Sequence, residues 1–114
     1  MKYKIYELIG ENCMSQRSGQ KLYDLIYPQL KAGKTVELDF TDVRRFLSIF
    51  FNFAIGQLLR DISVEDFDKL LVVSNLSPLG EQAYYHVIES AKRYYSDEQY
   101  RQAVDEINLE YSLS

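Results

Sequence analysis

The side chains best suited to chemistry are few and lie far apart in the sequence. The chain of 114 residues contains one cysteine, Cys13, and one histidine, His86. A nucleophilic thiol needs a general base within hydrogen-bonding reach, and no local motif brings these two residues together. A single thiol and a single imidazole also fall short of the usual zinc ligand sets. We therefore expect no Cys–His catalytic pair and no metal site.

Two aspartates offer a second kind of chemistry. Asp39 and Asp42 follow a predicted strand, where carboxylates can bind Mg²⁺ as they do in receiver-type domains. The same residues also fit a structural role, as a loop aspartate and a hydrogen bond at the strand end. The enzymatic alternative is thus a small phosphoryl-accepting or hydrolytic enzyme that uses Asp39 and Asp42, or Cys13. No G-x-G-x-x-G or P-loop motif occurs, so we expect no cofactor.

Composition narrows the classes of function further. The net charge of -4 and the scattered basic residues argue against nucleic acid, which requires a concentrated positive surface. The longest apolar stretch is interrupted by polar residues and is shorter than the ~20 residues that span a bilayer. We therefore expect no membrane segment. One cysteine fits a reducing, cytoplasmic setting, and the length fits a single domain over residues 1–114.

Hydrophobic periodicity predicts seven elements in the order β-α-β-α-β-α-α. Alternating apolar residues indicate strands at 2–9 and 35–40, and a continuous apolar run indicates a strand at 70–73 that is covered on both faces. Helical spacing indicates helices at 16–32, 47–61 and 79–95. A capping box of Ser96 and Gln99 predicts a last helix, with Tyr100, Ala103, Val104 and Ile107 on one stripe.

This element order predicts an α/β fold. We expect a small sandwich with a mostly parallel or mixed central sheet, flanked by about four helices.

The predicted helix at 47–61 is amphipathic, with two exceptions. Ile49 and Phe53 lie one turn apart among its polar residues. They either pack under a neighbouring loop or helix, or form a small exposed apolar patch for a partner, with the small Gly56 beside them. The remaining apolar residues are expected to face the sheet: Leu47, Phe50, Phe51, Ala54, Ile55 and Leu58.

The segment VELDFTDVRRFLSIFFNFAIGQLL, residues 36–59, resembles the central part of STAS domains, named for sulphate transporters and anti-sigma factor antagonists. The matching positions are Val36, Leu38, Asp39, Phe40, Thr41, Val43 and Gly56. The closest similarity is to a bacterial STAS-like group of unknown function, which has an arginine in its first helix, here Arg17. The resemblance implies a domain that acts by binding and is not an enzyme.

In anti-sigma factor antagonists, the start of this helix docks on an ATPase-type kinase that phosphorylates a serine there. Aligning on Asp39 and Val43 puts Ser48 at or beside that serine, although Leu47 replaces the acidic residue of the family pattern. The resemblance therefore implies a signalling regulator with a phosphorylation site at Ser48. We expect the partner surface, or a homodimer contact, to comprise Arg44, Arg45, Ser48, Ile49, Asn52, Phe53 and Gly56.

Overall fold

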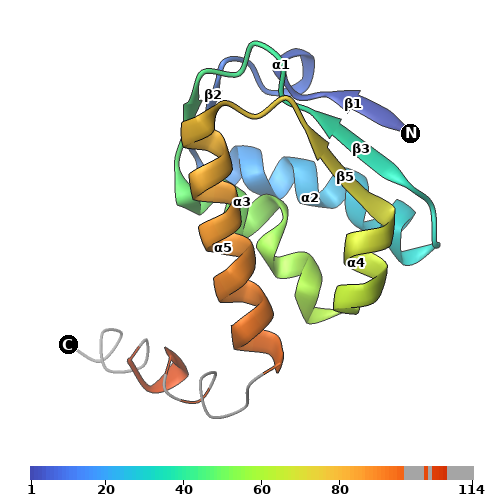
Figure 1. Ribbon diagram of the computed structural model, residues 1–114, viewed down its shortest axis with the longest axis vertical. Coiled ribbons are helices and arrows are strands. Elements are labelled where there is room, and N and C mark those ends of the chain that lie inside the picture. The colour runs from blue at the N-terminus through green and yellow to red at the C-terminus, as the bar shows by residue number, and fades with distance from the viewer. Residues whose placement is uncertain (97–101, 103, 108–114) are drawn as a thin grey trace.

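The computed structural model describes residues 1–96, 102 and 104–107 (Figure 1). Its elements are β1 (Lys2–Lys4), α1 (Ile5–Leu8), β2 (Asn12–Cys13), α2 (Gln16–Lys31), β3 (Val36–Asp39), β4 (Arg45–Phe46), α3 (Ser48–Ala54), the 3₁₀-helix η1 (Gly56–Arg60), α4 (Val64–Leu70), β5 (Leu71–Ser74) and α5 (Pro78–Ser96). The segment 104–107 is also helical. Gln99, Tyr100 and Ala103 of the predicted last helix lie outside the described residues.

The predicted α/β architecture is confirmed. Strands β1, β3 and β5 form a parallel sheet in that order, with Tyr3 beside Leu38 and Leu38 beside Val73. Two further strands, β2 and β4, form a separate parallel pair. No helix in the described part of the chain is long and apolar enough to cross a membrane.

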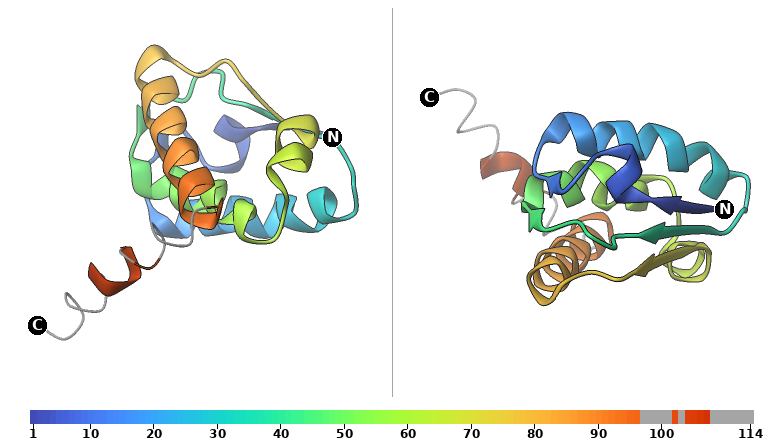
Figure 2. Two further views of the ribbon diagram at one scale, coloured as in Figure 1. Left: turned by 60° about the horizontal axis from the view of Figure 1, so that its bottom comes forward. Right: turned by 90° about the horizontal axis from the view of Figure 1, so that it is seen from above.

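Helices cover one face of the three-stranded sheet and leave the other open. The right-hand view of Figure 2 looks onto the open face, with the helices behind the strands. The prediction that the strand at 70–73 is covered on both faces is therefore wrong: Val72 is 44% exposed. Because this face of the sheet is open, the apolar run of β5 supplies one inward face and one outward face.

The first predicted strand, 2–9, is also too long. Strand β1 ends at Lys4, opposite the last residue of β3, Asp39. Without a neighbouring strand beyond that point, the backbone turns into α1, where Ile9 N–H donates to the Ile5 carbonyl at 2.8 Å. Ile5 is fully buried by this turn.

The predicted helices at 16–32 and 79–95 are confirmed as α2 and α5. Ser15 and Ser77 cap them, since each hydroxyl accepts a hydrogen bond from a backbone N–H three residues later. The short helix α4 was not predicted, although Ser63 caps it in the same way.

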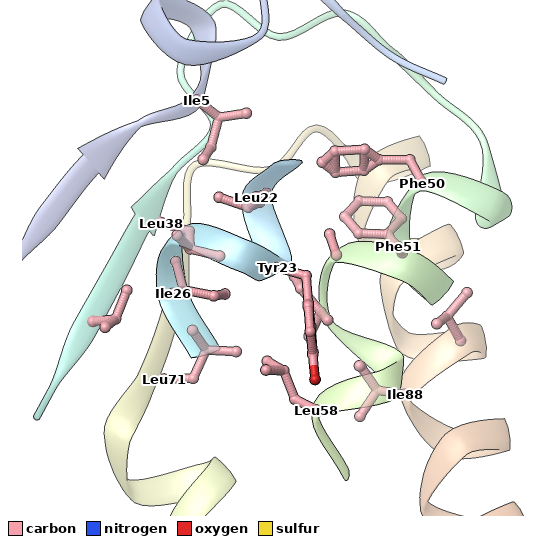
Figure 3. Close-up of a cluster of buried hydrophobic side chains, with 14 of the residues drawn as sticks. Ile5, Leu22, Tyr23, Ile26, Leu38, Phe50, Phe51, Leu58, Leu71 and Ile88 are labelled. Carbon is pink, nitrogen blue, oxygen red and sulfur yellow. The ribbon is translucent and has the colours of Figure 1, made fainter. Parts of the chain in front are cut away.

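Helix α3 lies in the core between α2 and α5 (Figures 1 and 3). Its approach to α2 is close because Gly19 faces it: a Cβ at Gly19 would lie 2.6 Å from the Phe50 carbonyl oxygen. The expected core face of the helix is confirmed for five residues, all fully buried: Phe50, Phe51, Ala54, Ile55 and Leu58.

The predicted continuous helix at 47–61 is interrupted. At Ile55 the backbone leaves helical geometry, with φ -130° and ψ -46°, and η1 follows. Because the helix is interrupted, the side chains of Leu58 and Leu59 point differently than they would in a continuous α-helix, and both are buried. Leu47 was expected to face the core, but it is 47% exposed. It precedes the first helical residue and has an extended backbone, so helical spacing does not apply to it.

Candidate partner-binding site

The pair β2–β4 sets the position of the α3 N-terminus. Asn12 pairs with Arg45 and Cys13 with Phe46, and the Leu47 N–H donates to the Cys13 carbonyl at 3.0 Å. Cys13 and Phe46 point inward, where the Phe46 ring stacks on Phe51 with a centroid distance of 5.5 Å. Because side chains alternate along an extended chain, the neighbours of Cys13 and Phe46 in the sequence point outward.

These neighbours include Met14 and Leu47, which follow the last residues of β2 and β4. Their side chains are 38% and 47% exposed, and Ile49, in the first turn of α3, is 41% exposed. Ser48, the first residue of α3, is also exposed. We call the exposed surface at this end of the molecule the docking ridge. It consists of Met14, Arg44, Arg45, Leu47, Ser48, Ile49 and Asn52.

The two arginines give the docking ridge a positive charge. Arg44 and Arg45 are exposed, and neither forms an ion pair with a carboxylate among residues 1–96 and 104–107. By contrast, Arg60 pairs with Asp61 at 3.2 Å, and Lys92 pairs with Asp68 at 3.3 Å. In a chain of net charge -4, the two arginines thus form a local excess of positive charge.

The other two predicted partner residues have packing contacts. Phe53 is half-buried and packs against α2. A Cβ built at Gly19 of α2 would lie 3.0 Å from the Phe53 Cβ. Gly56 is buried: a Cβ there would lie 3.3 Å from Val87 Cγ1 and 3.7 Å from Ala91 Cβ of α5. The small size of Gly56 therefore accommodates α5. Asn52 remains exposed at the edge of the ridge.

Asp39 and Asp42 line a different feature, an open hollow of about 370 Å³ at the carboxyl ends of β1 and β3. Asp39 Oδ1 accepts hydrogen bonds from Thr41 Oγ1 at 2.6 Å, Asn75 Nδ2 at 2.9 Å and Thr41 N–H at 3.0 Å. Lys2 Nζ lies 3.7 Å from Oδ2. The Thr41 hydroxyl, followed by Asn75, holds the pKa of Asp39 well below its usual range.

This hydrogen bonding ties the end of β3 to the loop after β5. Asp42 stands apart from that network and has a left-handed backbone, with φ 69°. No group of three or more His, Cys, Asp or Glu side chains in the described residues could hold a metal ion. Asp39 thus performs a structural task that accounts for its burial.

Cys13 is fully buried on the inner face of the β2–β4 pair. Burial raises the pKa of its thiol from 9.0 to about 12, so the nucleophilic thiolate is scarce near neutral pH. His86 is exposed on α5. The cysteine proposed for the enzymatic alternative is therefore inaccessible in this conformation.

Sequence reasoning identified Arg44, Arg45, Ser48, Ile49 and Asn52 but missed Met14 and Leu47. Nothing in the local sequence of residues 10–15 marks a strand, because β2 is only two residues long. The signal that was present is the alternation of Arg45, Phe46 and Leu47, which predicts that the first and third share a face.

Comparison with known proteins identifies one family. No curated protein and no solved structure matches the chain. Residues 18–81, more than half of the chain, match one described family; the range includes most of α2 and all of β3, α3 and β5. That family is not a known enzyme family. The chain belongs to the family described as the STAS-like domain of unknown function (DUF4325).

Proposed function

We propose that this domain is a non-enzymatic regulatory module that binds a protein partner through the docking ridge. The observation that carries the proposal is the exposure of Leu47 and Ile49 beside two arginines, Arg44 and Arg45, without an ion pair among the described residues. Apolar side chains at the centre of a contact and charges at its rim are the usual anatomy of a protein interface. An acidic partner surface would complement the arginines and accelerate association.

The partner that the family resemblance suggests is an ATPase-type kinase, with Ser48 as the residue it phosphorylates. Ser48 is exposed at the start of α3. A phosphate there would add about 1.5 to 2 negative charges between Leu47 and Ile49. The charge would disfavour an apolar contact and would also oppose an acidic partner surface. Phosphorylation of Ser48 would therefore release the partner.

The test compares two aspartate substitutions in the full chain. Ile49→Asp places a charge on the docking ridge, and Val72→Asp places one at a similarly exposed position, 44% against 41%, on the open sheet face. We expect Ile49→Asp to weaken capture of the partner by at least about 30-fold, as for a central interface residue. Val72→Asp should retain capture.

Equal capture by the wild type and both variants would contradict the proposal, as would equal loss in both variants. Ser48→Asp, which adds one charge, should weaken capture less than Ile49→Asp, and Ser48→Ala should retain it. Phe53→Asp is a poorer probe than Ile49→Asp, because Phe53 also packs beside Gly19. The stability of each variant should be measured alongside, by urea unfolding.

Self-association through the same ridge is a second arrangement that the exposed apolar side chains support. A symmetric dimer would juxtapose the arginines of two copies, so it should be weakened by low salt. Sedimentation of the wild type and Ile49→Asp distinguishes the two arrangements. A homodimer that dissociates in the variant favours self-association, and a monomer in both favours a different partner.

A further inference from the structure

A groove of about 430 Å³ runs between the end of α1 and the first half of α2. A smaller hollow continues this groove as far as Leu25, which is 36% exposed. The groove lies outside the docking ridge, and the proposed function does not use it. Its lining combines apolar, hydroxyl and basic side chains: Leu8, Ile9, Ser15, Arg17, Ser18 and Lys21.

The two basic side chains of the groove have no carboxylate partner in the described part of the chain. Arg17 and Lys21 are both exposed and lie one turn apart on α2. Lys21 Nζ donates a hydrogen bond to the Leu8 carbonyl at 3.0 Å, which ties α1 to α2. An apolar groove with cations along its edge has the chemistry that receives an amphipathic helix bearing acidic residues.

The C-terminal segment 97–114 has the complementary chemistry. It contains five acidic residues and one basic residue, and therefore carries the whole net charge of -4. Residues 1–96 contain twelve acidic and twelve basic residues. At helical spacing, Asp105 and Glu106 fall outside the apolar stripe of the segment. That stripe consists of Tyr100, Ala103, Val104 and Ile107.

The described part of this segment lies far from the groove of its own chain. Residues 104–107 are helical, and the Tyr94 hydroxyl donates to Asp105 Oδ1 at 2.6 Å. Ile107 is 52% exposed. Figure 1 draws these residues, in red, beyond the end of α5 and at the opposite end of the molecule from α1. A groove that receives this segment therefore belongs to a second copy of the chain.

We propose that the α1–α2 groove of one copy binds the C-terminal segment 97–114 of a second copy. The apolar stripe of the segment covers the apolar floor of the groove, and its carboxylates face Arg17 and Lys21. Because the groove and the segment are different surfaces, the contact is heterologous, and two copies that exchange segments form a closed dimer. The opposite charges accelerate association and make the dimer sensitive to salt.

Disulfide crosslinking between two variants of the full chain tests the contact. Leu25→Cys places a thiol in the groove and Ile107→Cys places one in the segment, while the native Cys13 is fully buried. In an equal mixture under a mild oxidant, a disulfide between the two variants is intermolecular, and mass spectrometry identifies it. We expect this heterodimer to form about tenfold faster than one between Ile107→Cys and Val72→Cys, because docking raises the effective concentration of the two thiols.

Val72 is 44% exposed on the open sheet face, so it is a matched control for Leu25. Equal rates of heterodimer formation with the two positions would overturn the proposal.

Sedimentation of the full chain tests the charge complementarity. Arg17→Glu should weaken the dimer by about fivefold, the upper range for an exposed ion pair. Lys34→Glu makes the same change in net charge at an exposed position beyond the end of α2, and should leave the dimer unchanged. Adding Glu106→Arg to Arg17→Glu should restore part of the affinity. Equal weakening by Arg17→Glu and Lys34→Glu would overturn the proposal, as would a wild type that stays monomeric.

Two aspartate variants distinguish this dimer from self-association through the docking ridge. A dimer formed through the groove should persist in Ile49→Asp and dissociate in Leu25→Asp. The reverse result would assign the dimer to the ridge and overturn the groove as its site.

Discussion

The docking ridge and the hollow lined by Asp39 lie within a few residues of each other in the sequence. They differ in whether their charged side chains have partners within the fold. In the hollow, the Asp39 carboxylate accepts three hydrogen bonds from Thr41 and Asn75 and faces Lys2. On the ridge, Arg44 and Arg45 have no ion pair within the described residues, and Leu47 and Ile49 are exposed. A charged side chain that has its hydrogen-bonding partners within the fold has a structural role. The ridge holds the groups that the described fold does not use, and function is best sought there.

The largest effect concerns Cys13, on the inner face of the β2–β4 pair whose outer face carries the ridge. Its thiol should react with a disulfide reagent at least about 30-fold more slowly than an exposed cysteine near pH 8. The pKa rise from 9.0 to about 12 lowers the thiolate fraction, and the greater nucleophilicity of a more basic thiolate offsets only part of that loss. Denaturation in urea should release the thiol to ordinary reactivity. Rapid reaction of the native protein would reopen the enzymatic alternative.

The next effect tests how the ridge is held in place. Gly19→Ala would put a Cβ 2.6 Å from the Phe50 carbonyl oxygen and force α2 and α3 apart. We expect it to lower the free energy of unfolding by about 1–3 kcal/mol, the cost of overpacking a core. Gly56→Ala, with a contact of 3.3 Å to the movable Val87 side chain, should cost less. Urea unfolding measures both, and equal losses would contradict the close α2–α3 contact.

A smaller, pH-dependent effect is expected in the hollow. Thr41→Val removes the hydroxyl that contributes most to the lowered pKa of Asp39. A carboxylate with a lowered folded-state pKa stabilises the protein above its unfolded pKa, about 4, and this contribution is lost as pH falls through the folded pKa.

The variant should therefore be less stable than the wild type at neutral pH, and the difference should shrink in acid. Urea unfolding at neutral and acidic pH measures it. Thr35→Val, at an exposed position before the first residue of β3 and so at the opposite end of the strand from Asp39, is the control that should show no pH-dependent difference. A difference that does not vary with pH would argue against the assigned role of Asp39.

The smallest expected effect is that of Mg²⁺ on the hollow. Because Asp39 Oδ1 is already saturated by hydrogen bonds, millimolar Mg²⁺ should leave the unfolding midpoint where NaCl of matched ionic strength leaves it. A stabilisation by Mg²⁺ that disappears in Asp42→Asn would support the phosphoryl-accepting alternative. That outcome would also contradict the structural role assigned to the carboxylates of the hollow.

Much of the fold follows from local sequence signals. The positions of α2 and α5, the apolar alternation of β3 and the buried face of α3 could all be predicted, because each depends on neighbours within a few residues. The open face of the sheet could not, since the run Leu71–Val73 reads alike whether helices cover one side or both. The pair β2–β4 is too short to carry a pattern of its own.

The candidate site divides in the same way. The sequence determined that Arg44, Arg45, Ser48 and Ile49 stand together at the start of a helix, because they are adjacent along the chain. Only the tertiary structure decided that Leu47 points outward, because that depends on the pairing of β4 with β2. It also decided that Gly56 is covered by α5. These contacts join segments separated by at least thirty residues, and packing between distant segments leaves no trace in local periodicity.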